Sequence, residues 1–500
     1  MMTQNYILSL DIGTTRASAT LYDRNFNALF SSSKHLNQYS PQPGWYEQDP
    51  DEIWEKLMSC VTNLLIISKC KPSEIAGIGI SNQRETTIVW DKTTGKPIYN
   101  ALAWESRQTE PLVQNLINAG YTDTIHDKTG LFIDPYFSAT KIIWILSQVD
   151  NARKMAEHGQ LLFGTIDSWI VWKLTKGALH ITDYTNASRT MMFNIHTLQW
   201  DADLLKIFNI PASLLPEVKS NSEVYGNTNA DVFFNAEIPI AALAGDQQAA
   251  LVGGLATSVG EVEGSYGTGA FIIMNTGKQL VMSKRHLLTT IAYSINGECT
   301  YAIEGSIFVA GSALQWLKDN LEMIDNVDDV EQLAKKSTDD GRLYVVPSFT
   351  GLSAPYWNAN ANAATFGMTQ KSTKYDYVRA TLESIAYQTN DILTSMVKDS
   401  NMPIKNIRVN GEVVKNGYLP QFLADLTGTT LHKKTAPNID SLGVAYLAGL
   451  AVGLWRDFNE ISQLQQNDEA LQPNMSPETR KKRYHGWQRA VKAVEFYTES

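Results

Sequence analysis

The chain has 500 residues, which is more than one hydrophobic core usually supports, so two domains of roughly 250 residues each are expected. Apolar residues make up 43% and charged residues 19%, a balance that is typical of globular proteins and excludes extensive disorder. The formal net charge of -10 excludes a broad basic surface for nucleic acid or an acidic membrane, and a small molecule is the expected partner.

The first predicted element is a strand, a turn and a second strand over residues 6–23, "YILSLDIGTTRASATLYD". Its turn contains Gly13, Thr14 and Thr15. Glycine lets the backbone approach a ligand closely, and the N–H groups and hydroxyls of such a turn can surround a phosphate. Asp11, just before the turn, adds a carboxylate of the kind that binds Mg²⁺. An ordinary hairpin without a ligand is the alternative.

Strands and helices alternate after this hairpin, which predicts an α/β fold. Residues 51–68 have apolar side chains at helical spacing, whereas residues 75–81 and 86–90 are typical of strands. Arg84 and Glu85, in "SNQRETT", follow the strand 75–81 and so lie at its carboxyl end, where α/β sheets bind ligands. A surface ion pair of little energetic value is the alternative.

A second polar group follows an apolar strand in "AALAGDQQAALVGGL", residues 241–255. Asp246 stands where the strand ends and a helix begins, so its carboxylate fits the role of a helix N-cap. The same carboxylate can accept a proton from a substrate hydroxyl, while Gln247 makes a second hydrogen bond. Both roles can hold together.

A second strand-turn-strand pattern occurs in "GEVEGSYGTGAFIIMNTG", residues 260–277, with Gly267, Thr268 and Gly269 in the turn. One Gly/Thr turn in each half predicts a duplicated fold, with two lobes facing each other across a cleft and a boundary near residues 250–258. Neither turn contains the Walker pattern, so each is a hairpin cradle and not a P-loop.

Targeting and redox signals are weak. The apolar stretch 441–455, "SLGVAYLAGLAVGLW", is shorter than the roughly 20 residues that cross a bilayer and predicts a buried helix. The polar N-terminus does not fit a signal peptide, so a cytoplasmic location is expected. Cys60, Cys70 and Cys299 are scattered and indicate neither a disulfide framework nor a zinc site.

Long stretches of the chain resemble one known family, including "SNQRETT", "KTGLFIDPYFSATKIIWIL", "TDYTNASRTMMFNIHTL", "LAGDQQAAL", "YGTGAFIIMNTG" and "FTGLSAPYW". The sequence is similar to the FGGY carbohydrate kinases over nearly its whole length, and among them to those that phosphorylate glycerol. The resemblance implies two ribonuclease-H-like lobes, as in actin and hexokinase, with a ligand cleft between them. It implies a glycerol-binding lobe over residues 1–253 and a nucleotide-binding lobe over residues 254–500.

The resemblance also implies site residues and ligands. Glycerol would be surrounded by Arg84, Glu85, Trp104, Tyr136, Asp246, Gln247 and Phe271, with Asp246 as the general base. The phosphates and nucleotide of ATP would lie against Thr14, Thr15, Arg16, Gly267, Thr268, Gly311, Gln315, Gly411 and Asn416. Asp11 would hold Mg²⁺. The implied product is sn-glycerol 3-phosphate, and the implied assembly is a homodimer or homotetramer.

The chain departs from the family pattern mainly on the nucleotide side. Arg16 and Ser18 stand where the family has serine and arginine. Residues 16 and 18 of a strand share one face about 6–7 Å apart, so Arg16 can supply the missing charge, or it can simply point to solvent. Asn410 and Glu412 replace an acid and a glycine. Glu105 replaces a glutamine, and "NANANAA" (358–364) replaces a segment with an arginine.

Three functions remain open at this stage. The leading one is an active ATP-dependent glycerol-phosphorylating enzyme. The second is a glycerol-binding or regulatory paralogue with a weakened nucleotide site, and the third is a kinase for a related polyol or ketose. Some bacterial members are activated by phosphorylation of a loop histidine, but the corresponding loop here, residues 227–240, contains none, so that control is expected to be absent.

Overall fold

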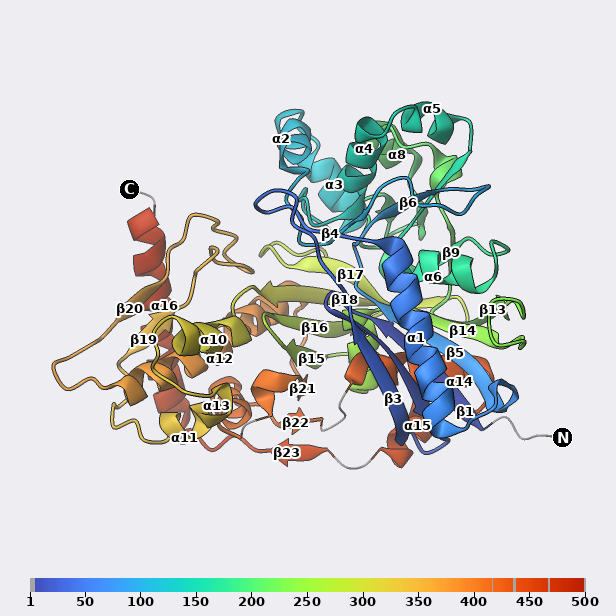
Figure 1. Ribbon diagram of the computed structural model, residues 1–500. Helices are drawn as coiled ribbons and strands as arrows, with labels where there is room; N and C mark the ends of the chain where they lie inside the picture. The colour runs from blue at the N-terminus through green and yellow to red at the C-terminus, as the bar shows by residue number, and fades with distance from the viewer. Residues whose placement is uncertain (1–4, 416, 435–437, 466–467, 499–500) are drawn as a thin grey trace. The chain divides into compact units, whose positions relative to one another are not determined.

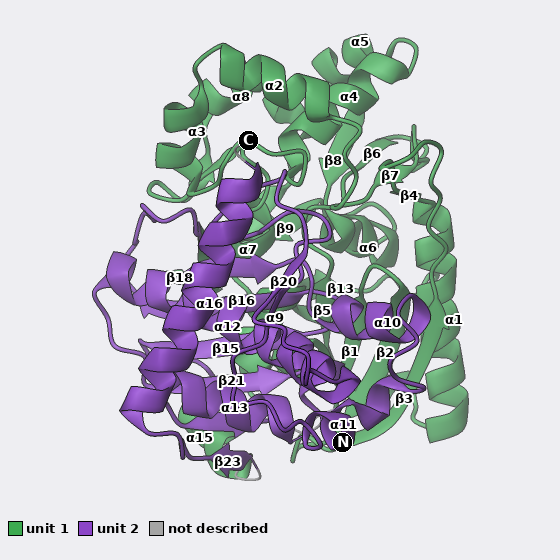
Figure 2. Cartoon of the chain, turned by 90° about the vertical axis from the view of Figure 1, so that its left-hand side faces the viewer, with its two compact units in different colours: residues 1–255, 289–301, 438–466 green, residues 256–288, 302–437, 467–500 purple. Residues whose placement is uncertain are grey.

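The computed structural model describes residues 5–415, 417–434, 438–465 and 468–498 and shows an α/β architecture (Figure 1). The chain divides into two compact units (Figure 2). The first unit comprises Met1–Leu255, Thr289–Tyr301 and Asn438–Gln466, and the second comprises Ala256–Leu288, Ala302–Pro437 and Asn467–Ser500. Two segments that follow residue 253 in the sequence, Thr289–Tyr301 and Asn438–Gln466, thus belong to the first unit. A single boundary after residue 253 does not describe this division, and the predicted glycerol-binding and nucleotide-binding lobes stay predictions.

The first unit contains most of the strands. They are β1 (Tyr6–Ile12), β2 (Arg16–Tyr22), β3 (Ala28–His35), β4 (Glu47–Gln48), β5 (Ile75–Asn82), β6 (Ile88–Asp91), β7 (Ala101–Leu102), β8 (Leu161–Gly164), β9 (Ile181–Asp183), β10 (Phe193–Asn194), β11 (Gln199–Trp200), β12 (Glu217–Lys219), β13 (Ser222–Asn227), β14 (Pro239–Gly245) and nearly all of β17 (Leu288–Ile295). Its helices are α1 (Pro50–Ser68), α2 (Glu110–Asn118), α3 (Thr122–Thr129), α4 (Ser138–Gln148), α5 (Ala152–Glu157), α6 (Ile166–Leu174), α7 (Tyr184–Ala187), α8 (Ala202–Phe208), α9 (Asp246–Gly253), α14 (Ile439–Ala451) and α15 (Phe458–Leu464).

In the main sheet, the strands of the first unit follow one another in the order β3-β2-β1-β5-β14-β13-β17. β1 pairs antiparallel with β2, as the opening hairpin predicts, and parallel with β5, which in turn pairs parallel with β14. Ile12 at the end of β1 and Gly245 at the end of β14 are both opposite Asn82 at the end of β5. Three parallel strands therefore end at the same edge of the sheet.

The second unit repeats this order with fewer elements. Its strands are β15 (Glu261–Tyr266), β16 (Ala270–Gly277), most of β18 (Glu298–Ile307), β19 (Tyr344–Val346), β20 (Ala364–Phe366), β21 (Asn406–Asn410), β22 (Leu431–Lys433) and β23 (Glu469–Leu471), and its helices are α10 (Gly311–Asp319), α11 (Val330–Ala334), α12 (Lys374–Ser400), α13 (Tyr418–Thr427) and α16 (Pro477–Thr498). β16, β15, β21 and β22 follow one another as an antiparallel hairpin joined to two parallel strands, as β2, β1, β5 and β14 do. The predicted duplicated α/β fold is confirmed.

Local sequence explains the two helices that flank the first sheet. α1 starts where the Asp49 carboxylate accepts from the N–H groups of Asp51 and Glu52, and one apolar face of the helix, including Ile53, Leu57 and Leu64, is buried. α14 corresponds to the apolar stretch 441–455 and is buried along most of its length. Gly443 is required because a side chain there would collide with the carbonyl oxygen of Ala249 in α9, so the two helices pack at backbone distance.

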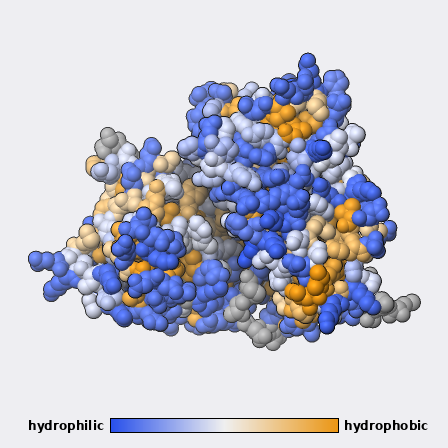
Figure 3. Space-filling view, viewed as in Figure 1, coloured by the Kyte–Doolittle hydropathy of each residue, from blue (hydrophilic) through white to orange (hydrophobic). Residues whose placement is uncertain are grey.

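The surface gives little further information on partners. Figure 3 shows one face that is mostly hydrophilic, with separate apolar patches. The exposed large apolar residues include Ile66 and Ile67 at the end of α1 and Phe496 and Tyr497 near the end of α16. Within the residues that the structure describes, no helix has the length and apolar character needed to span a bilayer.

Candidate active site

Polar side chains gather where the three parallel strands of the first unit end. Asp11 lies near the end of β1, Arg84 and Glu85 follow β5, and Asp246 follows β14. Since these strands end in register, the sheet brings together residues that are up to 235 positions apart in the sequence. The predicted location of Arg84 and Glu85 at a carboxyl edge is confirmed.

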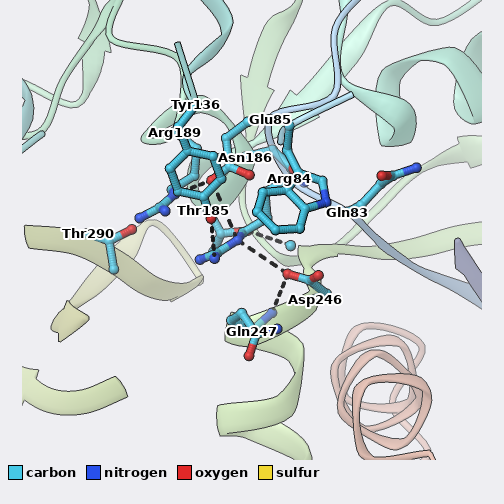
Figure 4. Close-up of polar contacts among 12 residues, drawn as sticks. Gln83, Arg84, Glu85, Tyr136, Thr185, Asn186, Arg189, Asp246, Gln247 and Thr290 are labelled. Atoms are coloured by element: carbon cyan, nitrogen blue, oxygen red, sulfur yellow. Dashed lines mark hydrogen bonds and ion pairs between the residues drawn. The ribbon is translucent and has the colours of Figure 1, made fainter. Parts of the chain in front are cut away.

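Arg84 makes the central contacts of this group (Figure 4). Its Nε lies 3.2 Å from Oδ1 of Asp246, its Nη1 donates to Oε1 of Gln248 over 3.3 Å, and its Nη2 donates to the hydroxyl of Tyr136 over 3.3 Å. The side chain is only 2% exposed. A buried guanidinium whose donors are divided between helix α9 and the loop before α4 holds a fixed orientation.

Glu85 is held by a second arginine that the sequence analysis did not single out. The Nε of Arg189 donates to Oε1 of Glu85 over 2.7 Å, and both side chains are essentially buried. The Arg189 guanidinium lies 5.5 Å from the ring centre of Tyr136 and 5.4 Å from that of Phe137. The alternative of a weak surface pair at Arg84 and Glu85 is therefore wrong, because both charges are buried within an ionic network.

Arg189 had a recognisable signal. It is an isolated cation beside the apolar run "TMMF", within one of the stretches that carry the family resemblance. A lone arginine at such a position needs a buried anion as its partner. The sequence does not show which of the distant carboxylates is that partner, and the structure identifies it as Glu85.

Asp246 is the first residue of α9 and not its N-cap. Gly245 occupies the cap position, and the Asp246 carboxylate accepts instead from the N–H of Gln247 over 2.7 Å. The prediction of an N-cap role is thus wrong, because β14 ends at Gly245 and α9 already begins at Asp246. A quarter of the Asp246 side chain is exposed, so one side of the carboxylate is accessible to a ligand while Arg84 holds the other.

The loop that carries Tyr136 is fastened by a buried lysine. Nζ of Lys141, on α4, donates to the carbonyl oxygen of Pro135 over 2.7 Å and also to that of Tyr136. Burial lowers the pKa of Lys141 to about 7, although the charges of Glu85 and Asp134 act in the opposite direction. Lys141 therefore fixes the backbone from which the Tyr136 hydroxyl reaches Arg84.

Trp104 connects this group with the first Gly/Thr turn. Its indole Nε1 donates to Oγ1 of Thr14 over 2.9 Å, and its ring meets that of Tyr136 edge to face at 5.4 Å. The carbonyl oxygen of Thr14 accepts from Nε2 of Gln48 over 2.7 Å. Two residues predicted for different ligands, Trp104 and Thr14, are therefore direct neighbours, while Thr15 is exposed.

Asp11 lies beside the same turn and is largely buried. Its Oδ2 accepts from Nδ2 of Asn438 over 3.0 Å. Burial raises the pKa of Asp11, while this hydrogen bond and the positive charge of Arg16 act in the opposite direction. The described residues contain no group of three or more His, Cys, Asp or Glu side chains that could hold a metal by themselves. Mg²⁺ usually binds through one or two carboxylates plus substrate phosphates, so a single carboxylate here fits that ion.

The exchanged pair Arg16 and Ser18 occupies two different environments. Ser18 is buried and lies directly opposite Asp11 in the ladder between β1 and β2. Arg16 is the exposed first residue of β2, opposite His35, and its charge reaches Asp11. The charge of Arg16 opposes the effect of burial on the pKa of Asp11. Compensation by Arg16 for the serine at position 18 stays a prediction.

The second Gly/Thr turn, in the other unit, is built almost entirely from backbone. The carbonyl oxygens of Gly267 and Thr268 accept from the N–H groups of Gly311 and Ser312 at the start of α10, over 3.0 and 3.1 Å. A side chain at Gly311 would come within 2.6 Å of the Gly267 oxygen. Gly411 has a φ of 107° and packs against the Tyr266 carbonyl, so only glycine fits there.

The structure therefore brings together four of the residues that were predicted to bind the nucleotide, namely Gly267, Thr268, Gly311 and Gly411. Gln315 is exposed on α10 and donates to Asp319, and Phe271 is half-buried on β16. Asn416 lies outside the described residues.

The departures on this side have defined structural positions. Asn410 ends β21, and its Nδ2 donates to Oε1 of Glu263 over 2.5 Å and to Oγ of Ser265 over 3.0 Å, so it joins β21 to β15. Glu412 is exposed and pairs with Lys415 at 2.6 Å. Asn410 is thus part of the buried framework, whereas Glu412 points to solvent.

Comparisons with known proteins agree with this arrangement. Residues 6–253 match the N-terminal domain of the FGGY family of carbohydrate kinases, and residues 262–452 match the C-terminal domain of that family. A glycerol kinase of Lactobacillus acidophilus is 54% identical over 496 residues, covering 99% of both chains. A glycerol kinase of Ligilactobacillus salivarius is 52% identical over 496 residues, covering 99% of this chain and 98% of that protein.

Solved structures are similar over the same length. The crystal structure of Plasmodium falciparum glycerol kinase with ADP superimposes with a TM-score of 0.93 at 37% identity, covering 98% of each chain. A gluconate kinase from Lactobacillus acidophilus gives a TM-score of 0.88 at 24% identity, covering 99% of this chain and 98% of that one, which reflects the shared fold alone.

Proposed function

The chain belongs to the FGGY family of carbohydrate kinases, and from this premise we propose how it carries out the ATP-dependent phosphorylation of glycerol. The observation that carries the proposal is the accessible carboxylate of Asp246, held 3.2 Å from the buried guanidinium of Arg84 at the carboxyl edge of the sheet. The predicted fold, family and kinase activity agree with the comparisons.

Asp246 acts as the general base. Its carboxylate accepts the proton of a terminal glycerol hydroxyl as that oxygen attacks the γ-phosphorus of ATP. Arg84 and the N–H of Gln247 both contact Oδ1 of the carboxylate, so the carboxylate keeps one orientation when the substrate arrives. Holding the reacting groups in place provides much of the rate enhancement in such transfers.

The charged network selects for hydroxyl groups. Glu85 and the Tyr136 hydroxyl present hydrogen-bonding atoms that are already oriented by Arg189 and Arg84, and the Trp104 ring offers an apolar face. A substrate without the hydroxyls would displace water from these polar groups without replacing its hydrogen bonds, which costs more than the loss of an apolar contact. The role of Phe271 as a contact of the glycerol carbon chain stays a prediction.

The Gly/Thr turns supply the phosphate contacts. Each offers backbone N–H groups and a threonine hydroxyl, from Thr14 and Thr15 in the first unit and from Gly267 and Thr268 in the second. Asp11 would hold Mg²⁺, which neutralises charge on the phosphates when it is bound. Arg16 adds a positive charge on the same side as Asp11. The cleft expected between the two lobes stays a prediction.

The alternative of a paralogue with a lost nucleotide site has less support. The turn with Gly267 and Thr268 keeps its tight backbone packing, and the Glu412 departure points to solvent. A homodimer or homotetramer and a cytoplasmic location stay predictions, as does the absence of control through a loop histidine.

The decisive experiment is an ADP-release assay coupled to NADH oxidation, with purified protein, ATP and Mg²⁺. Glycerol, dihydroxyacetone and a pentulose are compared at equal concentrations. We expect kcat/KM to be highest with glycerol. Glycerol binding without ADP release would favour the regulatory paralogue, and a higher kcat/KM with the pentulose would favour a ketose kinase.

A further inference from the structure

We infer that Asp183, which is buried and was not predicted as a site residue, is a positioning residue that holds Asp246 and Arg84 in register for phosphoryl transfer. This inference rests on the proposed function. Asp183 ends β9 and is the N-cap of α7, so its carboxylate accepts from the N–H groups of Thr185 and Asn186. A cap alone would explain these two bonds, but Asp183 makes three more.

The additional bonds connect Asp183 to side chains that in turn bind the active-site strands. Its Oδ1 accepts from Oγ1 of Thr185 and from Nδ2 of Asn221 over 2.8 Å. Its Oδ2 accepts from Nδ2 of Asn186 over 2.6 Å. All five groups that face the carboxylate are hydrogen-bond donors. The ionised carboxylate, which only accepts, therefore pairs with all of them.

Two of these side chains fasten the end of β14, which leads directly to Asp246. Oγ1 of Thr185 donates to Asp183 and accepts from the N–H of Gly245 over 2.9 Å. Nδ2 of Asn221 donates to the carbonyl oxygen of Leu243 over 2.8 Å. The residue immediately before Asp246 is therefore held by a hydroxyl whose hydrogen is directed by Asp183.

A third side chain fastens the end of β5, which leads to Arg84. Asn186 and Asn82 exchange two amide hydrogen bonds of 3.0 Å, and Nδ2 of Asn82 also donates to the carbonyl oxygen of Gln83 over 2.9 Å. The two strand ends also touch, because a Cβ at Gly245 would come within 2.5 Å of Cγ of Arg84. The Asp183 carboxylate thus sets the relative position of the two strand ends that lead to Asp246 and Arg84.

A second buried carboxyl, Asp167, lies near Asp183 and clarifies which of the two carries the charge. Asp167 accepts from the hydroxyls of Thr165 and Thr182, the latter over 2.7 Å, and from the backbone N–H of Ser168. Burial and the charge of Asp183 raise the pKa of Asp167 to about 7. Burial raises the pKa of Asp183 as well, while the hydrogen bonds from Thr185 and Asn186 act in the opposite direction. Since Asp183 faces five donors and Asp167 three, the ionised form is better stabilised at Asp183.

The test removes the hydroxyl between Asp183 and Gly245 without changing the shape of the side chain. Thr185→Val is compared with Thr185→Ser, which keeps the hydroxyl. Thr175→Val is the matched control, because Thr175 is also buried and its hydroxyl also accepts from a backbone N–H, that of Leu179 over 3.2 Å, at the end of α6. Steady-state kcat and both KM values are measured, along with the urea midpoint of each variant.

We expect Thr185→Val to lower kcat by about 10- to 100-fold while the KM for ATP changes less than about twofold, as for a misplaced reacting group. Thr185→Ser should recover most of the rate, and Thr175→Val should affect only stability. Asp183→Asn, which places a donor against donors, should be at least as impaired as Thr185→Val. If Thr185→Val and Thr175→Val have equal kcat values, the inference is wrong and Asp183 is only a helix cap. If the unsubstituted protein releases no ADP with glycerol, the proposed function fails instead.

Discussion

The two Gly/Thr turns belong to repeats of one topology, yet the sites around them are built differently. In the first unit, the turn lies beside a buried ionic network of Arg84, Glu85, Arg189 and Asp246. In the second unit, the turn is held by backbone hydrogen bonds and by glycines that leave no room for a side chain. The first site therefore depends on the charge and orientation of side chains, and the second depends on the absence of side-chain atoms at its glycines. Removing a charge should damage the first, and adding a methyl group should damage the second.

The largest expected effect comes from removing the charge at the centre of the first site. Asp246→Asn keeps the shape but cannot accept the proton, so kcat should fall by about 10²- to 10⁴-fold with little change in glycerol binding. The rate is measured by the coupled assay and binding by calorimetry. Asp231→Asn, on an exposed carboxylate that pairs with Lys176, is the control and should retain full activity. A near-normal kcat for Asp246→Asn would leave Asp246 with a structural role only.

A methyl group should damage the second site. Gly411→Ala places a Cβ against the Tyr266 carbonyl in a backbone conformation that disfavours side chains, so the turn with Gly267 must shift. We expect the KM for ATP to rise about tenfold or more, since misplacement by about 1 Å is costly, with glycerol affinity unchanged. Gly453→Ala is the control, because Gly453 also has a positive φ but has open space around it. Equal ATP kinetics in the two variants would contradict a volume-limited site.

Lys141 extends the comparison, because its amino group is buried beside the first site and burial there disfavours its charged form. Its pKa of about 7 lies below that of an unfolded lysine at about 10.4, so the unfolded chain binds more protons between these values. The free energy of unfolding should therefore gain a contribution as pH rises from about 7 to 10, and Lys141→Met should remove it.

Urea unfolding at pH 7 and pH 9 measures this difference for the unsubstituted protein and for Lys141→Met. The same variant should raise the KM for glycerol several-fold, because Tyr136 loses the clamp on its backbone. Lys173→Met, on a partly exposed lysine that pairs with Asp51, is the control. An identical pH dependence in all three proteins would show that Lys141 stays charged in the folded state.

The smallest effect is expected at the exchanged residues of the first turn. Arg16→Ala should raise the KM for ATP and lower kcat by about three- to tenfold without changing glycerol affinity, because the lost charge acts on the phosphates. Arg24→Ala, in the exposed turn between β2 and β3, should have no such effect. A silent Arg16→Ala together with faster ATP use by Ser18→Arg would show that the exchange is a loss and not a compensation.

Much of the candidate site could be predicted because its residues stand at boundaries of local structure. Arg84 follows an apolar strand, Asp246 separates a strand from a helix, and the two Gly/Thr turns interrupt alternating residues. The role of Asp246 as an N-cap was predicted wrongly, because a shift of one residue at the strand end moves the cap to Gly245. Element boundaries of this kind depend on contacts such as that between Thr185 and Gly245.

The sequence by itself determined the fold class, the duplicated hairpins, the family and most of the residues at the strand ends, because hydrophobic periodicity and turn chemistry act over short distances. Only the tertiary structure decided that Arg189 pairs with Glu85, that Lys141 holds the Tyr136 loop and that Asp183 joins two strand ends. All three groups are buried and must find partners to offset the loss of hydration. Lys141 binds carbonyl oxygens five and six residues away in an irregular loop, whereas Arg189 and Asp183 have partners 104 and 38 residues away in the sequence. The strand order of the sheet is what brings those partners within hydrogen-bonding distance.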